Sequence, residues 1–188
     1  MAVSLEVKKR FLRTCIEEKD AKMVDVMLKV GTPLDSTDIL MAIENADYAT
    51  LKVLFKYTPD WLKGALGTSK MYNDEKETIL HVAARSGNVR IIKQVLDYFD
   101  KYQDYLIREL NGGKMNVLQV AASKGDLESV IFLSQQCLEY EFLANGNIYG
   151  MSAIDLASGP HKEEMKVYLA SLTNELKKNQ KTEKTKTR

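Results

Sequence analysis

Apolar residues recur at three- and four-residue spacing in short runs along the chain, and polar capping residues or glycine separate the runs. In the clearest case, apolar positions concentrate in residues 79–84 and again in 91–96, on either side of Gly87. This spacing places apolar side chains on one face of a helix. Thr78 and Asn88 are residue types that cap helix N-termini, and glycine readily takes the left-handed conformation that ends a helix. The pattern predicts two short helices joined by a tight turn.

The same arrangement recurs four more times. The apolar residue near the start of each first helix serves as a reference, and successive references lie 27, 41, 38 and 36 residues apart. These references are Leu12, Ile39, Leu80, Leu118 and Ile154. Three residues after each reference comes a small side chain: Cys15, Ala42, Ala83, Ala121 and Ala157. Because one helix pair cannot bury its apolar face alone, the row of small residues predicts five pairs stacked side by side.

Other positions repeat in the same register and have predicted structural roles. Residue types that cap helix N-termini occur two residues before the reference in four copies: Thr37, Thr78, Asn116 and Ser152. They also occur eight residues after it in four copies: Asp20, Asp47, Asn88 and Asp126. Seven residues after the reference, the third and fourth copies carry glycine. The predicted structural residues are Thr78, His81, Ala83, Gly87, Asn88, Ala121, Gly125 and Asp126.

Residues 78–87 resemble an ankyrin repeat, whose usual wording is T-P-L-H-x-A-A-x-x-G. Every specified position matches except the proline, which is Ile79 here. The resemblance implies an all-α solenoid of paired antiparallel helices with finger loops, which binds other proteins and does not catalyse a reaction. It also implies that His81 makes a structural hydrogen bond between adjacent loops.

We expect residues 1–172 to form the repeat domain, with an insertion at 58–77, and residues 173–188 to form a basic, flexible tail. In the insertion, Pro59 suits the first turn of a short helix, and Trp61 is expected to pack onto the solenoid. The second helix of the third pair is expected to continue into residues 97–106.

Composition supports a folded helical domain and argues against several other classes. The 188 residues are 45% hydrophobic and carry a net charge of +1, which argues neither for nor against nucleic acid. The tail has a net charge of +4, but no aromatic residues interleave with its lysines, so a solvated terminus is favoured over a nucleic-acid or membrane contact. No apolar stretch is long enough for a signal-peptide core or a membrane span, which favours a cytoplasmic or nuclear location.

The sequence contains no recognisable constellation for chemistry. The two histidines, His81 and His161, lie in different copies, and no metal-ligand spacing or phosphate loop is present. Cys15 and Cys137 also lie in different copies, and buried, reduced thiols are favoured over reactive ones. We therefore predict no catalytic residues, no cofactor and no metal.

The resemblance places a protein-binding surface on a concave face, which exposed positions of the first helices and the finger loops line. The helix positions, five and six residues after each reference, are Glu17, Glu18, Glu44, Asn45, Arg85, Ser86, Ser123 and Lys124. The finger positions are Tyr72, Met115, Ile148, Tyr149 and Met151. Acidic residues in the first two copies and basic ones in the next two predict a polarised groove, although ordinary solubilising residues would give the same pattern. Replacing Arg85 and Lys124 with glutamate should then weaken binding without lowering stability.

The favoured function is a monomeric, non-enzymatic adaptor, inhibitor or scaffold that binds a partner protein. One alternative is a pathogen or symbiont effector, exported to bind a host protein. A second is a nucleic-acid or membrane-surface binder directed by the basic tail.

Overall fold

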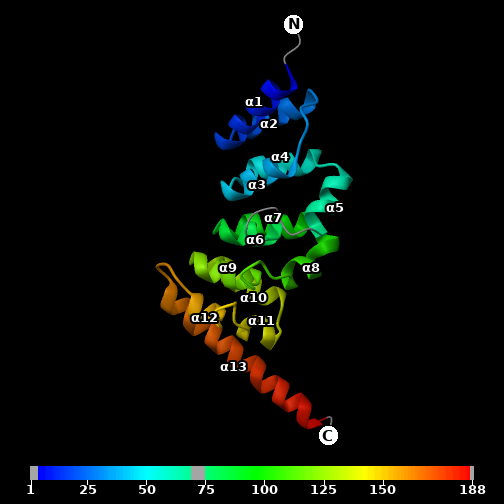
Figure 1. Cartoon of the computed structure of the whole chain (residues 1–188). Coiled ribbons are helices and arrows are strands. Elements are labelled where there is room, and N and C mark those ends of the chain that lie inside the picture. The colour runs from blue at the N-terminus through cyan, green and yellow to red at the C-terminus, as the bar shows by residue number, and fades with distance from the viewer. Residues whose placement is uncertain (1–3, 69–74, 187–188) are drawn as a thin grey trace.

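The computed structural model describes residues 4–68 and 75–186, and within them all regular structure is helical (Figure 1). The helices are α1 (Leu5–Glu17), α2 (Ala21–Lys29), α3 (Ser36–Glu44), α4 (Tyr48–Tyr57), α5 (Asp60–Thr68), α6 (Ile79–Arg85), α7 (Val89–Tyr98), the 3-10 helix η1 (Asp100–Tyr102), α8 (Gln103–Arg108), α9 (Val117–Lys124), α10 (Leu127–Gln136), α11 (Tyr140–Ala144), α12 (Ala153–Leu156) and α13 (Lys162–Lys186).

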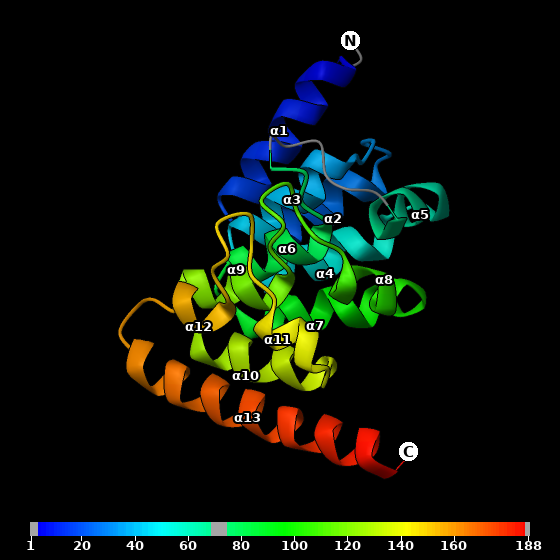
Figure 2. The ribbon, with the colours of Figure 1, turned by 60° about the horizontal axis from the view of Figure 1, so that its bottom comes forward.

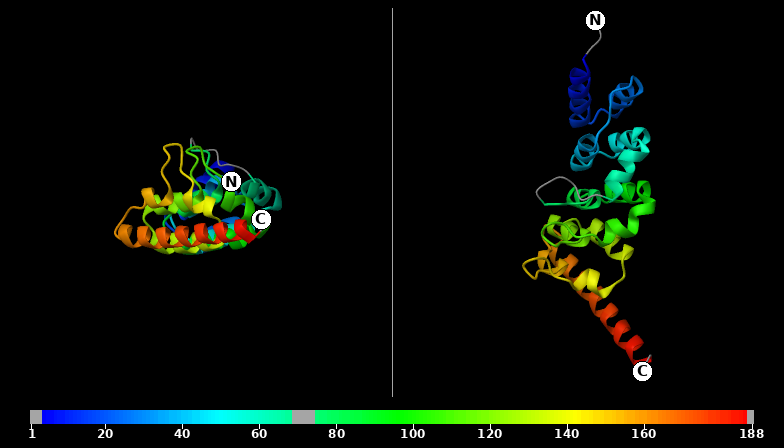
Figure 3. Two further views of the ribbon diagram at one scale, coloured as in Figure 1. Left: turned by 90° about the horizontal axis from the view of Figure 1, so that it is seen from below. Right: turned by 45° about the vertical axis from the view of Figure 1, so that its right-hand side comes forward.

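The helices are arranged as an elongated stack of five pairs in the described residues, α1/α2, α3/α4, α6/α7, α9/α10 and α12/α13 (Figure 1). The first helices α1, α3, α6, α9 and α12 pack against one another in chain order and form one layer. The helices α2, α4, α7 and α10 do the same and form a second layer. Loops between the pairs project to one side of the stack (Figure 3). The predicted all-α solenoid of paired helices is confirmed.

The small residues of the repeating register lie where the first helices approach one another. Ala42, Ala83 and Ala121 are fully buried, and Cys15 and Ala157 are nearly so. The larger core side chains come from both layers and form one continuous cluster along the stack. The row of small side chains therefore lets adjacent pairs share one core, as the sequence predicts.

The turn inside each of the first four pairs adopts the same left-handed backbone conformation. Gly87 and Gly125 have φ of 64° and 84°, and the equivalent positions hold Lys19 at 59° and Ala46 at 51°. The residue after each of them caps the second helix, through the predicted side chains of Asp20, Asp47, Asn88 and Asp126. The turn shape is thus common to the four pairs, whether or not the residue is glycine.

Gly125 is needed both for its left-handed backbone conformation and for a close approach of the next helix pair. A Cβ atom there would lie 2.9 Å from the carbonyl oxygen of Ser158 and 3.0 Å from the Cα of Gly159. The fifth pair therefore approaches the backbone of the fourth at a distance that only glycine allows.

Three additional helical segments account for the irregular spacing of the pairs. They are α5, η1 with α8, and α11, and each lies in one of the three longer intervals. The helix expected after Pro59 is α5. The expected extension of α7 is wrong, because α7 ends at Tyr98 and the chain turns at the fully buried Phe99 into η1.

Two further expectations about single residues are wrong. Trp61 does not pack onto the solenoid, since it is 69% exposed on α5. The contact of α5 is made instead by the buried Leu62 and Leu66 and by Gly67, whose missing side chain leaves room for the ring of Tyr102. Thr37 does not cap α3, because Asp35 forms the capping box with Asp38 and begins the helix two residues earlier.

The last helix runs along the end of the stack and beyond it (Figure 2). Its residues Met165 and Leu169 are buried in the core cluster of the stack. The helix passes position 173 without interruption and reaches Lys186, where the sequence predicts a flexible tail. Helical structure therefore continues past residue 172, where the sequence predicts the repeat domain to end.

Candidate functional site

The two finger loops that precede α9 and α12 are built on the same hydrogen-bonding pattern. Asn111 accepts hydrogen bonds at its Oδ1 from the backbone N–H groups of Gly113 and Met115, both at 3.0 Å. Asn147 accepts in the same way from Tyr149 at 2.9 Å and from Met151 at 3.1 Å. Each asparagine side chain therefore closes its own loop and gives the finger a defined shape.

Backbone hydrogen bonds join successive fingers. The N–H of Gly112 donates to the carbonyl oxygen of Glu75 at 2.6 Å, and the N–H of Ile148 donates to that of Gly113 at 3.1 Å. Loops far apart in the sequence are thus held side by side. A partner would meet a preformed surface, so little ordering entropy would be lost on binding.

Buried polar side chains fix the fingers to the helix layer. The Nε2 of fully buried His81 lies 3.0 Å from the Met115 carbonyl oxygen, and its Nδ1 accepts from the Thr78 N–H at 3.2 Å. The ring therefore donates through Nε2, and the loop-linking role implied for His81 is present. In the next pair, Gln119 takes this place and donates to the carbonyl oxygens of Asn145 at 2.8 Å and Met151 at 3.0 Å.

The finger residues predicted from sequence differ in exposure. Tyr149 is 80% exposed and lies between Ile148 at 52% and Met151 at 38%. Met115 is half-buried and packs against the core, and Tyr72 lies outside the described residues. We call Ile148, Tyr149 and Met151 the finger surface.

The predicted helix residues lie together at the C-terminal ends of α1, α3, α6 and α9, but the basic members are engaged within the molecule. Arg85 pairs with Glu77 at 2.6 Å, Glu44 at 3.0 Å and Glu75 at 3.7 Å. The Glu77 side chain is only 1% exposed. Arg85 therefore links the second and third pairs structurally, and its replacement is not expected to leave stability unchanged.

Other predicted helix residues also make contacts within the molecule. The hydroxyls of Ser86 and Ser123 donate to carbonyl oxygens of their own helices at 2.7 and 2.8 Å. The aliphatic part of Lys124 lies against Gly87. Of the predicted helix residues, exposed Glu17 and Glu18 and partly buried Asn45 remain available for a partner, whereas Glu44 is paired with Arg85.

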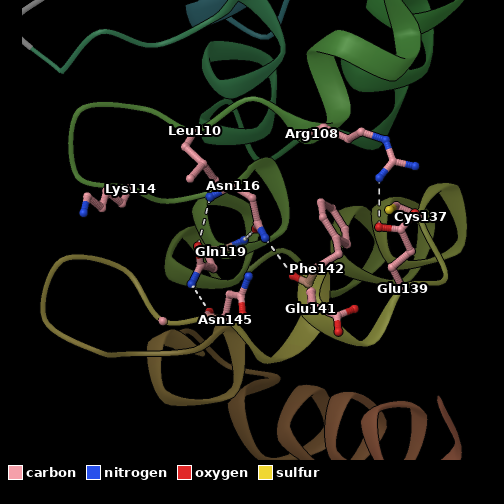
Figure 4. A pocket seen from close by; sticks show the side chains of 11 residues that line it. Arg108, Leu110, Lys114, Asn116, Gln119, Cys137, Glu139, Glu141, Phe142 and Asn145 are labelled. Carbon is pink, nitrogen blue, oxygen red and sulfur yellow. Dashed lines mark hydrogen bonds and ion pairs between the residues drawn. The ribbon is translucent and has the colours of Figure 1, made fainter. Parts of the chain in front are cut away.

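A hollow of about 360 Å³ lies beside the fingers (Figure 4). Lys114 of one finger and Asn145 at the base of the next line it, together with Leu110 and Phe142. The amide of Asn116 at its floor donates to the Phe142 carbonyl oxygen at 2.7 Å. The hollow thus combines an apolar patch with polar groups that already form hydrogen bonds within the protein.

An ion pair crosses one wall of the hollow. Arg108 lies 2.8 Å from both Asp104 and Glu139. The hydrogen bond from Arg108 lowers the pKa of the Glu139 carboxyl, and the two carboxylates raise the pKa of Arg108. The opposite charges are therefore compensated across this wall.

The described residues contain no group of side chains suited to hold a metal ion. Both cysteines are buried and unpaired, and burial raises the pKa of Cys15 and of Cys137. Each is therefore a protonated thiol at neutral pH, and a thiol is a poor nucleophile. Among the same residues no helix is both long and apolar enough to span a membrane.

A family model for ankyrin repeats (3 copies) matches residues 39–145, more than half of the chain. The chain belongs to the ankyrin-repeat family. The match includes the second, third and fourth pairs, and the first and last lie outside it. A search of curated proteins found no match. Ankyrin repeats are in general protein–protein interaction modules, and no catalytic family was identified.

Sequence reasoning found the exposed finger residues but missed what shapes the ankyrin fingers. Asn111 and Asn147 lie four residues before Met115 and Met151, in the register of the repeat, and this common spacing was the available signal. The hollow gave no such signal, because its walls come from α8, α9, α11 and the loops around them, which meet only in the folded chain.

Proposed function

We propose that this ankyrin-repeat protein is a non-enzymatic binding module that holds a partner protein on its finger surface and in the adjoining hollow. The observation that carries the proposal is the exposure of Tyr149, Ile148 and Met151 on a hydrogen-bonded, preformed loop. Tyrosine and methionine are enriched at interfaces, and a large aromatic side chain in a rigid loop is a typical binding hot spot.

The hollow supports the same role. Its apolar residues Leu110 and Phe142 could receive a side chain of the partner, and the exposed charge of Lys114 stands at its edge. Tyr149 would then insert into the partner, and a side chain of the partner would insert into the hollow beside it. The compensated Arg108–Glu139 pair disfavours a strongly charged occupant.

The test is quantitative affinity capture from cell extract with the intact chain, with proteins identified by mass spectrometry. The double variant Tyr149→Ala with Met151→Ala is compared with wild type and with Val167→Ala, a matched removal of an apolar side chain that is 71% exposed on α13. Melting temperatures verify that all three proteins fold equally.

We expect a specific partner to be retained by wild type and by Val167→Ala, and its retention to fall about tenfold or more with the double variant. Equal retention by all three proteins would show that the finger surface is not the binding site.

A further inference from the structure

The second helix layer carries a groove between α4 and α7, remote in the fold from the fingers. Two adjoining hollows of about 480 and 390 Å³ form it, and Tyr48, Gln94 and Asp97 line both. The finger loops lead into the first-layer helices, whereas this groove lies between two helices of the second layer. A ten-residue helix is about 15 Å long, so the groove can hold an extended segment of roughly four or five residues.

The walls of the groove are positively charged. Lys52 and Lys56 project from α4, and Arg90 and Lys93 project from α7, against the single carboxylate of Asp97. All four cationic residues are exposed. Among the described residues, only Lys56 of the four has an ion pair, with Asp25 at 3.5 Å. The groove therefore carries an uncompensated positive charge, although the whole chain has a net charge of only +1.

The floor of the groove includes the stacked rings of Phe55 and Tyr98, and the faces of Tyr98 are already covered. Phe55 stacks on Tyr98 with ring centroids 4.0 Å apart and planes at 7°. The ammonium group of Lys63 lies 4.3 Å from the centroid of the Tyr98 ring. A nucleobase would find no open face of Tyr98 on which to stack. Only Tyr48, which lines both hollows and is 45% exposed, remains for stacking, whereas single-strand binding typically uses several aromatic side chains in succession. The ring edges still offer apolar contact.

We propose that this groove binds a short acidic segment of a partner protein, distinct from any contact made at the fingers. Carboxylates of the segment would pair with Lys52, Arg90 and Lys93, and an apolar residue between them would lie on the edge of Tyr98. Asp97 distinguishes a peptide from a nucleic-acid backbone. Its carboxylate accepts hydrogen bonds from peptide N–H groups and hydroxyls, whereas it repels phosphates, which offer only acceptors.

The proposal is tested by fluorescence anisotropy with the intact chain. The probe is a short fluorescein-labelled peptide that is rich in glutamate and has a leucine at its centre. A peptide with glutamine in place of glutamate and a labelled single-stranded oligonucleotide are the comparison ligands. The test variant is Lys52→Glu with Arg90→Glu. The control is Lys162→Glu with Lys177→Glu, two exposed residues of α13 whose reversal changes the net charge equally.

We expect the acidic peptide to bind more tightly than both comparison ligands, with an affinity that falls as salt rises. The test variant should weaken binding about tenfold or more, while the α13 variant and Tyr149→Ala with Met151→Ala leave it unchanged. Tighter binding of the oligonucleotide would replace this proposal with nucleic-acid binding. Equal binding of the glutamine peptide, or equal loss in the α13 variant, would overturn it. Because the finger surface is tested by affinity capture and the groove by this peptide assay, the failure of one binding surface can be told apart from the failure of the other.

Discussion

At the scale of single residues, the backbone conformation of the repeat is more constant than the residue that adopts it. Four successive turns have φ between 51° and 84°, yet only Gly87 and Gly125 are glycine. A residue with a Cβ in the left-handed region costs about 1–2 kcal/mol. Lys19 and Ala46 therefore carry strain that the surrounding helix pairs impose.

Replacing Lys19 with glycine should accordingly stabilise the protein. Lys19 is exposed, so little packing is lost, and relief of the left-handed strain outweighs the greater flexibility of glycine in the unfolded chain. We expect a gain of about 0.5–1 kcal/mol in the free energy of unfolding, measured by urea titration. Lys19→Ala is the control, because alanine removes the charge and keeps the Cβ. An equal gain in both variants would attribute the effect to the charge.

At the scale of elements, side chains tie neighbouring helices of the second layer together. Asp25 of α2 accepts a hydrogen bond from the Tyr57 hydroxyl of α4 at 2.8 Å and pairs with Lys29 one turn further along its own helix. The hydrogen bond from Lys29, together with that from Tyr57, lowers the pKa of Asp25 to about 2. The ionised form is therefore the one that links α2 to α4.

This link makes a predictable contribution to acid sensitivity. The Asp25 pKa is about 2 in the folded protein and about 3.9 in an unfolded chain, so the stabilisation is complete above about pH 5. It is lost as the pH falls through about 4 towards 2, because the unfolded chain binds the proton more readily. The difference in unfolding free energy between wild type and Asp25→Asn should therefore shrink over that range in urea titrations. A difference that stays constant would contradict the assignment.

At the scale of the whole molecule, the solenoid is a chain of local interfaces. Each helix pair contacts mainly the pairs before and after it, so the stability of such an array is approximately the sum of repeat and interface terms. At two of these interfaces, the polar side chain at the third position of the first helix makes the link. His81 joins the third pair to the loop before the fourth, and Gln119 joins the fourth to the loop before the fifth.

The two residues should therefore be interchangeable in function. We expect His81→Gln to retain most of the stability, because glutamine can accept from Thr78 and donate to Met115 as Gln119 does in its own pair. His81→Leu should cost about 1–3 kcal/mol, since the buried N–H of Thr78 would lose a partner. Urea titrations of the two variants measure their free energies of unfolding. Equal losses of unfolding free energy in the two variants would show that the His81 ring acts by packing alone.

Much of this architecture could be predicted from the sequence, because it depends on local patterns. The recurring small residues, the caps and the apolar spacing each act within one helix pair, so they predicted five stacked pairs. The structural hydrogen bond of His81 was implied by the resemblance of residues 78–87 to an ankyrin repeat. The exposure of Tyr149 followed from its place in a finger loop.

Other features depend on residues that meet only in the folded chain. Arg85 was expected to face a partner, but it pairs with Glu44 of α3 and with Glu75 and Glu77 of the segment before α6. Trp61 was expected to be covered, yet Gly67 of the same helix makes the contact with Tyr102. The sequence by itself determined the repeating pairs, because helix periodicity and capping are short-range. Only the tertiary structure decided which charges are compensated, where the hollows lie and which aromatic side chains stay exposed, because these depend on distances between separate elements.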